Sequence, residues 1–321
     1  MIGPMRILIA HAEPGAGLAW QRELARRLPD AQLAQAAGTP DAAGRAAPDG
    51  WADYVVGWAP PLDLFGRQPG LRAIFSTGAG VDHLLRHPGL PASLPVHRLV
   101  DAGMGALMAD YCLHALLDIA GRHDAYRHAQ TRTSWAPLEP IPRAELPVGI
   151  LGLGVLGTRV ARGLVQAGFT VHGQARSPRA VDGVIVHAGA AGWPAFLAAT
   201  RVLVLLAPLT PSTANLVGAD ALARLRPGAW LVNVARGGLV VDADLLAALD
   251  AGRLDGAVLD VFRDEPLPPS HPFWRHPKVR LTPHVSAPTQ VGDSADQVAA
   301  GLRALARGEP AAGRVDRERG Y

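Results

Sequence analysis

The sequence predicts an α/β protein of two domains, each built on a doubly wound parallel sheet. Strand-like and helix-like stretches alternate along the chain, as they do where helices join the strands of a parallel sheet. The length of 321 residues, with 49% hydrophobic and 18% charged residues, suits two domains of ordinary size. Four prolines between Thr131 and Pro147 exclude a continuous helix there and separate two runs of alternation.

The first run of alternation covers about one hundred residues. We expect a helix at Leu18–Leu28 and a loop or weak helix from Ala34 to Gly50. A long helix from about Gly105 to His128 should follow, and then an extended crossing segment over 131–147. The expected strands are Arg6–His11, Tyr54–Trp58, Arg72–Ser76 and Val96–Val100.

The second run starts at Val148, with expected helices at Leu156–Ala167 and Asp242–Asp250. A last helix, about Thr289 to Arg307, should return to the first domain. The predicted domains are therefore 1–104 plus 287–321, for the substrate, and 105–286, for a dinucleotide. The charged tail Val315–Tyr321 is predicted to be disordered on composition. The expected strands are Val148–Leu151, Thr170–Gln174, Gly183–His187, Val202–Leu206, Trp230–Asn233, Ala257–Val261 and Val279–Thr282.

Composition excludes several classes of protein. Lys278 is the only lysine and has Trp274 four residues before it, so there is no Tyr-x-x-x-Lys pair and no Gly-Lys-Ser/Thr phosphate loop. The single cysteine, Cys112, excludes a disulfide within the chain and fits a reduced, cytoplasmic setting. No basic run marks a nucleic-acid partner, and no apolar run is long enough for a membrane span. No cluster has metal-ligand spacing, so no metal is expected.

A glycine-rich motif, Gly152-Leu-Gly154-Val-Leu-Gly157, follows the expected strand at Val148–Leu151 and opens a helix. In that setting the first glycine allows a tight turn and the second lets the backbone approach a pyrophosphate. The third lets helix and strand pack closely. The helix N-terminus then favours the anion, so this motif predicts a dinucleotide site.

The residues after the next strand indicate which dinucleotide is bound. A carboxylate there would bind the ribose 2′-hydroxyl of NAD, but the first acid is Asp182. Arg176, Ser177 and Arg179 stand in its place, and a guanidinium fork suits a 2′-phosphate. We therefore expect NADPH to be preferred over NADH; the alternative is that these arginines only form an exposed loop.

Three residues that follow expected strands form a candidate reacting site: Arg236, Glu265 and His284. Ligands of open α/β sheets bind at the carboxyl ends of the strands, where these residues would meet. Histidine can give a proton near neutral pH, a carboxylate can orient its ring, and arginine can bind a substrate carboxylate. These types fit reduction of a ketone by hydride transfer.

The order and spacing of these motifs resemble the D-isomer-specific 2-hydroxyacid dehydrogenase family over nearly the whole chain. The matching stretches are Gly152–Gly157, Asn233–Gly238, Leu259-Asp-Val-Phe through Glu265-Pro-Leu, and Thr282-Pro-His284. Within the family the chain is similar to the glyoxylate/hydroxypyruvate reductase A branch. That likeness is carried by Ala52–Trp58, Gly78–Asp82, Ala207–Pro211, Asp264–Pro268 and Val315–Tyr321.

The resemblance implies NADPH-dependent reduction of small 2-keto acids, glyoxylate and hydroxypyruvate, to D-2-hydroxy acids. It implies a cleft between two Rossmann/flavodoxin-like domains, in which Arg236 holds the substrate, His284 is the proton donor and Glu265 assists it. It also implies a homodimer formed through the cofactor domain, with the segment near Trp135 in the contact. It further assigns the substrate to Trp58, Ala79 and Gly80, and the cofactor to Met104, Val155, Leu156, Ala207, Pro208, Val234, Ala235 and, at the nicotinamide carboxamide, Asp260.

Two alternatives stay open at this point. One keeps the chemistry but reduces a larger 2-keto acid, which would need a roomier pocket, with NADH. The use of NADH stays open because Gln174, two positions before Arg176, stands where the branch has a large aromatic residue. The other is a dinucleotide-sensing regulator of the same fold. A two-domain enzyme should close on its ligands, so hinges are expected near Asp101–Gly105 and Val285–Pro288.

Overall fold

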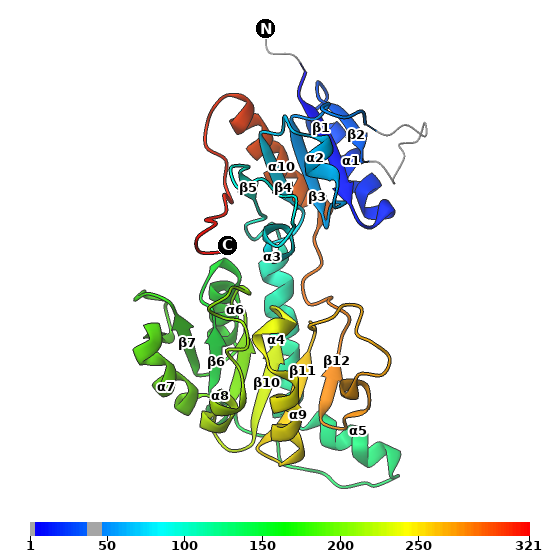
Figure 1. The fold of residues 1–321 in the computed structure, drawn as a ribbon. Helices are drawn as coiled ribbons and strands as arrows, with labels where there is room; N and C mark the ends of the chain where they lie inside the picture. The colour runs from blue at the N-terminus through cyan, green and yellow to red at the C-terminus, as the bar shows by residue number, and fades with distance from the viewer. Residues whose placement is uncertain (1–3, 37–46) are drawn as a thin grey trace. The chain divides into compact units, whose positions relative to one another are not determined.

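The computed structural model describes residues 4–36 and 47–321, so part of the loop expected at Ala34–Gly50 lies outside the described residues. The chain divides into two compact units (Figure 1). Unit 1 contains Met1–Gly103 and Thr289–Tyr321, and unit 2 contains Met104–Pro288.

Unit 1 is built on a five-stranded sheet in the order β2-β1-β3-β4-β5, with every pair parallel. This is the flavodoxin-like order, in which helices cover both faces. Leu64 and Leu84 pack with strand residues on one face, and the two longer helices pack together on the other. The strands are β1 (Arg6–His11), β2 (Gln32–Gln35), β3 (Tyr54–Trp58), β4 (Ala73–Ser76) and β5 (Val96–His97). The helices are α1 (Pro14–Arg27), α2 (Leu64–Arg67), α3 (Asp82–Leu85) and α10 (Val291–Ala306).

Three sequence predictions for unit 1 need correction. Strand β2 was not predicted, and it occupies the start of the expected loop. Strand β5 ends three residues early because the Arg98 N–H donates to the Gly313 carbonyl, and the backbone of Val100 pairs with the Gln297 side chain, instead of with a strand. The tail is not disordered: Val315 is buried, its N–H donates to the Val96 carbonyl at 2.8 Å, and the Asp316 carboxylate caps the turn after it. Composition did not reveal these specific anchors.

Unit 2 is built on a seven-stranded parallel sheet in the order β12-β11-β10-β9-β6-β7-β8. The strand order reverses between β6 and β9, which is the point where Rossmann-type sheets bind ligands. The strands are β6 (Val148–Leu151), β7 (Val171–Ala175), β8 (Val184–Ala188), β9 (Val202–Leu205), β10 (Ala229–Asn233), β11 (Leu254–Leu259) and β12 (Val279–Leu281). Two parallel α/β units confirm the predicted fold class.

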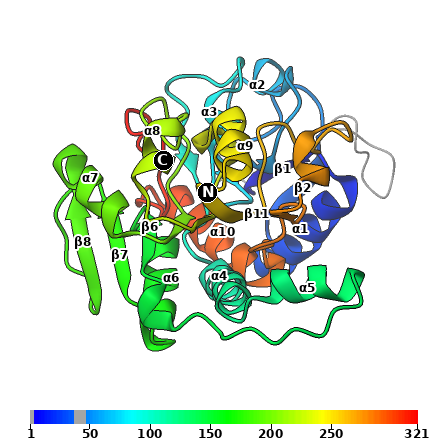
Figure 2. The ribbon, with the colours of Figure 1, turned by 90° about the horizontal axis from the view of Figure 1, so that it is seen from below.

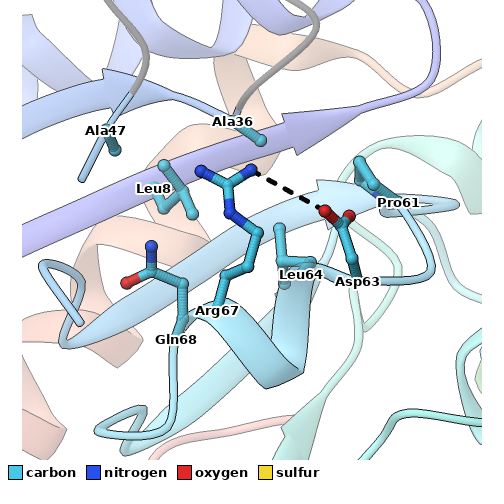
Figure 3. Close-up of a pocket in the computed structure, with 8 residues that line it drawn as sticks. All are labelled: Leu8, Ala36, Ala47, Pro61, Asp63, Leu64, Arg67 and Gln68. Atoms are coloured by element: carbon cyan, nitrogen blue, oxygen red, sulfur yellow. Dashed lines mark ion pairs between the residues drawn. The ribbon is translucent and has the colours of Figure 1, made fainter. Parts of the chain in front are cut away.

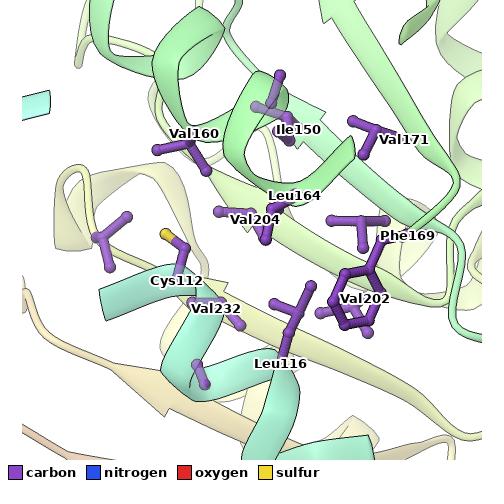
Figure 4. Packing of buried hydrophobic residues seen from close by; sticks show 14 of the residues in the cluster. Cys112, Leu116, Ile150, Val160, Leu164, Phe169, Val171, Val202, Val204 and Val232 are labelled. Carbon is purple, nitrogen blue, oxygen red and sulfur yellow. The ribbon is translucent and has the colours of Figure 1, made fainter. Parts of the chain in front are cut away.

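Helices cover both faces of this sheet (Figure 2). Helices α4 (Met104–Ala120) and α6 (Val155–Gln166) pack Leu116 and Leu164 against one face (Figure 4). Phe196, Leu222 and Leu245 pack against the other face; they lie on α7 (Gly189–Ala199), α8 (Ala219–Arg224) and α9 (Asp242–Asp250). Helix α5 (His123–Thr131) and the 3-10 turns η1 (Arg143–Glu145), η2 (Gly237–Leu239) and η3 (Pro272–Arg275) complete the unit.

The long helix predicted over Gly105–His128 is broken into α4 and α5. Arg122 between them has a left-handed backbone, with φ of 55°, which an α-helix cannot contain. The buried Asp118 carboxylate accepts hydrogen bonds from His123 and Arg127 of α5, so it stabilises the break. Most other boundaries differ from the predicted ones by one residue, although β11 starts three residues early and α1 four. Within residues 4–36 and 47–321, no helix is long and apolar enough to cross a membrane.

Candidate active site

His284 and Glu265 form a hydrogen-bonded pair at the carboxyl edge of the unit 2 sheet. The His284 Nδ1 atom lies 2.8 Å from Glu265 Oε2. A carboxylate can only accept, so Nδ1 carries the proton and Nε2 is left to face a reactant. The Glu265 Oε1 atom accepts from the Phe262 N–H at 2.8 Å, which fixes the carboxylate in turn. The two side chains are 42% and 36% exposed, so a small molecule can reach them.

The backbone holds His284 in an uncommon conformation. Its φ is 55°, a value that few non-glycine residues adopt, and one that indicates a constrained site. The His284 N–H donates to the Asp260 carbonyl at 2.8 Å, which ties the loop after β12 to the end of β11. Neighbouring strands therefore bring Glu265 and His284 together, as their positions after two strands predict.

Arg236 lies in the loop after β10, the next strand of the sheet. A Cβ atom at Gly237 would lie 2.0 Å from the Phe262 carbonyl carbon, so only glycine lets this loop approach the chain that leads to Glu265. The Asn233 side chain donates to the Arg236 carbonyl at 2.9 Å and accepts from the Ala235 N–H, which closes the turn. Gly237 therefore allows the backbone of the Arg236 loop to lie against the backbone at Phe262.

The charges of this group shift the pKa of Glu265. Burial acts to raise it, but hydrogen bonds from His284 and Phe262 and the charges of His284 and Arg236 outweigh burial. The pKa of Glu265 is therefore lowered. The carboxylate stays ionised near neutral pH and can stabilise an imidazolium at His284. Of the three predicted reacting residues, the structure brings His284 and Glu265 into contact and places the charge of Arg236 near them.

The glycine loop fits a dinucleotide at each of its three glycines. Gly152 has a φ of 103°, and a Cβ there would lie 2.7 Å from the Ala207 nitrogen. A Cβ at Gly157 would lie 1.8 Å from the Gly152 oxygen, whereas one at Gly154 would meet no atom within 4 Å. Gly154 begins α6 without a side-chain cap, so the N–H groups of the first turn are available to a phosphate.

The predicted nucleotide-selecting residues follow β7 and are exposed. Arg176, Ser177 and Arg179 lie on this loop, and the Arg179 guanidinium donates to the carbonyl of Leu153 in the glycine loop. At the end of β7, Gln174 is buried and donates to the Gly189 carbonyl at 2.7 Å. Within the described chain, the structure thus brings one arginine to the loop where the pyrophosphate is expected.

The remaining predicted cofactor residues lie along the same edge of the sheet. Ala207 and Pro208 follow β9, Val234 and Ala235 follow β10, and Met104 is the buried first residue of α4. Val155 and Leu156 form the first turn of α6. Asp260 follows β11 and is fully buried, with both carboxylate oxygens accepting hydrogen bonds. Their contacts with a cofactor stay predictions.

The predicted substrate residues of unit 1 lie at the ends of two neighbouring strands. Trp58 ends β3, and a Cβ at Gly78 would lie 2.4 Å from its indole, so the glycine allows the ring to lie on the loop that carries Ala79 and Gly80. The His83 ring lies 3.8 Å from the Trp58 ring, centroid to centroid. Sequence reasoning missed His83, because a histidine on a short helix carries no motif.

A hollow in unit 1 lies apart from these residues. Figure 3 shows Arg67 and Asp63 facing each other across it as an ion pair. None of the predicted site residues lines it. In the described part of the chain, no group of three or more His, Cys, Asp or Glu side chains could hold a metal ion.

The comparisons with known proteins define the class to which this fold and site belong. Residues 113–286 match the sequence model described as "D-isomer specific 2-hydroxyacid dehydrogenase, NAD binding domain". The chain belongs to the D-isomer-specific 2-hydroxyacid dehydrogenase family. The predicted family resemblance is therefore confirmed.

Several curated relatives and solved structures belong to one branch of this family. A glyoxylate/hydroxypyruvate reductase A of Serratia proteamaculans is 43% identical over 94% of this chain and 96% of its own. One of Yersinia enterocolitica is 41% identical over the same shares. The NADPH-dependent glyoxylate/hydroxypyruvate reductase of Sinorhizobium meliloti, solved with NADP and sulfate, superposes with a TM-score of 0.91 at 36% identity, covering 99% and 100% of the two chains. A Xanthobacter autotrophicus relative with NADPH and MES gives 0.92, also at 36% identity, over 99% and 100% of the two chains. The predicted likeness to the reductase A branch is confirmed.

Proposed function

We propose that this protein reduces glyoxylate and hydroxypyruvate with NADPH, giving D-2-hydroxy acids where the product is chiral. The observation that carries this proposal is the 2.8 Å bond between His284 Nδ1 and Glu265 Oε2, beside Arg236, on the sheet that carries the glycine loop. Relatives at 41–43% identity bear the name of this reductase. We expect the same reaction here.

His284 supplies the proton in this proposal. Reduction of a carbonyl develops negative charge on its oxygen, and His284 Nε2 is the nitrogen that Glu265 leaves available. The ionised Glu265 stabilises the imidazolium form and keeps the ring oriented. Arg236 binds the substrate carboxylate through its planar fork and polarises the carbonyl. When bound, NADPH supplies the hydride.

The glycine loop and the loop after β7 hold the cofactor in this proposal. The open face of Gly154 and the uncapped N-terminus of α6 suit the pyrophosphate. Arg176, Ser177 and Arg179 suit the 2′-phosphate, and two solved relatives that align with nearly the whole chain contain NADPH or NADP. NADPH is therefore the expected cofactor, and slower use of NADH is compatible with the same fold.

The substrate domain has a smaller part in the proposal. Backbone groups of Ala79 and Gly80 would bind the substrate carboxylate, and Trp58 would limit the size of the group next to the carbonyl. We assign the predicted domains, 1–104 plus 287–321 and 105–286, to substrate and cofactor. We expect them to close on ligands at the hinges predicted from the sequence.

We also propose a homodimer in the cytoplasm. Trp135 is 98% exposed, and Leu138 and Tyr126 beside it are also exposed, so this segment offers apolar area to a second copy. Cys112, the only cysteine in the chain, is free and buried, so the fold needs no disulfide and no oxidising compartment. Sedimentation of the wild type and Trp135→Ala tests the dimer; an unchanged dimer in the variant would remove the segment from the interface.

The test is the initial rate of NADPH and of NADH oxidation with glyoxylate, hydroxypyruvate, pyruvate and phenylpyruvate. The proposal expects fast NADPH-dependent turnover of the first two, with D-glycerate formed from hydroxypyruvate. Turnover restricted to phenylpyruvate would show a larger substrate, and turnover with NADH alone would discard the 2′-phosphate interpretation. No turnover with any pair would favour the dinucleotide-sensing regulator.

A further inference from the structure

A chain of hydrogen bonds leads from helix α4 to the loop that carries His284. The hydroxyl of Tyr111, on α4, lies 2.5 Å from Thr282 Oγ1. The Thr282 hydroxyl donates to Asp260 Oδ1 at 2.6 Å. The Asp260 carboxylate also accepts from the N–H groups of Val285 and Ser286, at 2.8 and 2.9 Å. One buried carboxylate therefore holds the residues on both sides of His284.

The direction of each bond in this chain follows from the number of protons. A carboxylate only accepts, so the single proton of the Thr282 hydroxyl goes to Asp260. Thr282 Oγ1 can then only accept from Tyr111, which must be the donor. Burial raises the pKa of Tyr111 to about 12, so the phenol keeps this proton at any pH at which the enzyme would be assayed.

The loop from Thr282 to Ser286 needs such support. His284 has the left-handed φ of 55°, a conformation that persists only where the surroundings over-determine it. The His284 side chain is hydrogen-bonded to Glu265 and is 42% exposed, so packing alone does not fix the ring. The backbone bonds to Asp260 hold the main chain of this loop, and so they fix the direction in which the His284 side chain leaves it.

We propose that Tyr111 is a positioning residue for His284, acting through Thr282 and Asp260. The inference rests on the proposed function, because it assumes that His284 delivers the proton. Tyr111 touches no reacting atom in this account. It restrains the Thr282 hydroxyl, which keeps the Asp260 carboxylate oriented toward the loop amides, and the amides keep the imidazole aimed.

Three substitutions test this series of hydrogen bonds, and a fourth serves as a matched control. Tyr111→Phe removes only the phenol hydroxyl, Thr282→Val removes the middle of the chain, and Thr282→Ser restores a hydroxyl there. The control is Thr200→Val in the same unit, which removes another buried hydroxyl, donated to the Phe196 carbonyl at 2.7 Å, away from the site. For each protein we would measure kcat and KM for hydroxypyruvate, and amide hydrogen exchange in the peptide covering residues 282–286.

We expect Tyr111→Phe to lower kcat by about 3- to 10-fold, the effect of one hydrogen bond, with KM for hydroxypyruvate within about twofold. Thr282→Val should lower kcat further, and the double variant with Tyr111→Phe should be no slower than Thr282→Val alone. Both should speed exchange of the loop amides. Thr282→Ser should recover most of kcat, and Thr200→Val should change neither readout.

Two results would overturn the inference: a Tyr111→Phe protein with wild-type kcat and exchange, or a Thr200→Val protein that loses as much kcat as Thr282→Val. The second result would show that any lost hydroxyl lowers turnover through stability. If the wild type turned over no 2-keto acid, the proposed function would fail by itself. Hydrogen exchange would still decide whether Tyr111 restrains the loop, since it needs no turnover.

Discussion

Two groups on the same edge of the unit 2 sheet are built in different ways. In the reacting group, His284 is bonded to Glu265, Glu265 to the Phe262 N–H, and the His284 backbone to Asp260. The nucleotide-selecting group, Arg176 to Arg179, is an exposed loop in which the Arg179 side chain donates to the Leu153 carbonyl. The first group is fixed before any ligand arrives, whereas the second presents charge on long side chains.

The difference follows from what each group has to do. A proton donor must be aimed within a few tenths of an ångström, so its orientation has to be fixed beforehand. A 2′-phosphate is recognised by charge, and flexible guanidinium groups can adapt to it. Substitutions in the first group should therefore lower kcat or kcat/KM for the keto acid, and those in the second should change which cofactor is used.

The largest effect is expected for His284→Ala. Removing the proton donor should lower kcat by about 10²- to 10⁴-fold, while the affinity for NADPH, measured by fluorescence titration, should stay near that of the wild type. The matched control is His276→Ala, because His276 also pairs with a carboxylate, Asp250 at 3.2 Å, outside the site. Turnover of His284→Ala near the wild-type level, or an equal loss in the control, would reject His284 as the donor.

Arg236→Lys tests the second member of the reacting group. Lysine keeps the charge but loses the planar fork, so kcat/KM for hydroxypyruvate should fall by about 10²-fold, mainly through KM. The measurement is steady-state kinetics at saturating NADPH. If only KM for NADPH changed, Arg236 would belong to the cofactor site and the substrate assignment would be wrong.

Local patterns in the sequence predicted where Arg236, Glu265 and His284 lie in the fold; their catalytic roles stay predictions. Each of Arg236, Glu265 and His284 follows a buried strand, and parallel strands place such residues at one edge. The position of a residue directly after a strand depends on a short stretch of sequence, which is why the sequence predicted it. The role of Gly237, where a Cβ would lie 2.0 Å from the Phe262 carbonyl carbon, required the structure.

Other features depend on partners far away in the chain. The tail is ordered because the Val315 N–H donates to the Val96 carbonyl, more than 200 positions earlier in the sequence. The hydrogen bond between Tyr111 on α4 and Thr282 after β12 joins residues 171 positions apart in the sequence. No pattern within a window of the sequence reports such contacts, so they required the structure.

A smaller effect is expected for Arg176→Ala combined with Arg179→Ala. Each guanidinium would lose a charge-assisted bond to the 2′-phosphate, so the preference for NADPH over NADH should fall by about 10- to 100-fold. The rate with NADH should hardly change, because NADH lacks that phosphate. Arg224→Ala, an exposed arginine on α8, is the control. An equal loss with both cofactors would indicate that the loop supports the fold and does not select the nucleotide.

Among the substitutions in these two groups, the smallest effect is expected for Glu265→Gln, and its effect on stability depends on pH. The carboxamide can accept from Phe262 but cannot stabilise an imidazolium, so kcat should fall by about 10-fold at pH 7. The pKa of Glu265 is lowered in the folded protein, so its ionised form stabilises the fold above the unfolded pKa of about 4.3. That contribution is lost as the pH falls through the folded pKa.

Urea unfolding of both proteins between pH 7 and pH 3 measures this contribution. The stability of the wild type relative to Glu265→Gln should decrease as the pH falls, because glutamine does not titrate. Glu309→Gln is a control at an exposed ion pair with Arg307 in unit 1, and it should leave kcat unchanged. A stability difference that grew toward acid pH would mean that the Glu265 carboxyl is held in its neutral form. The hydrogen bond between Glu265 and His284 would then not be an ionic pair.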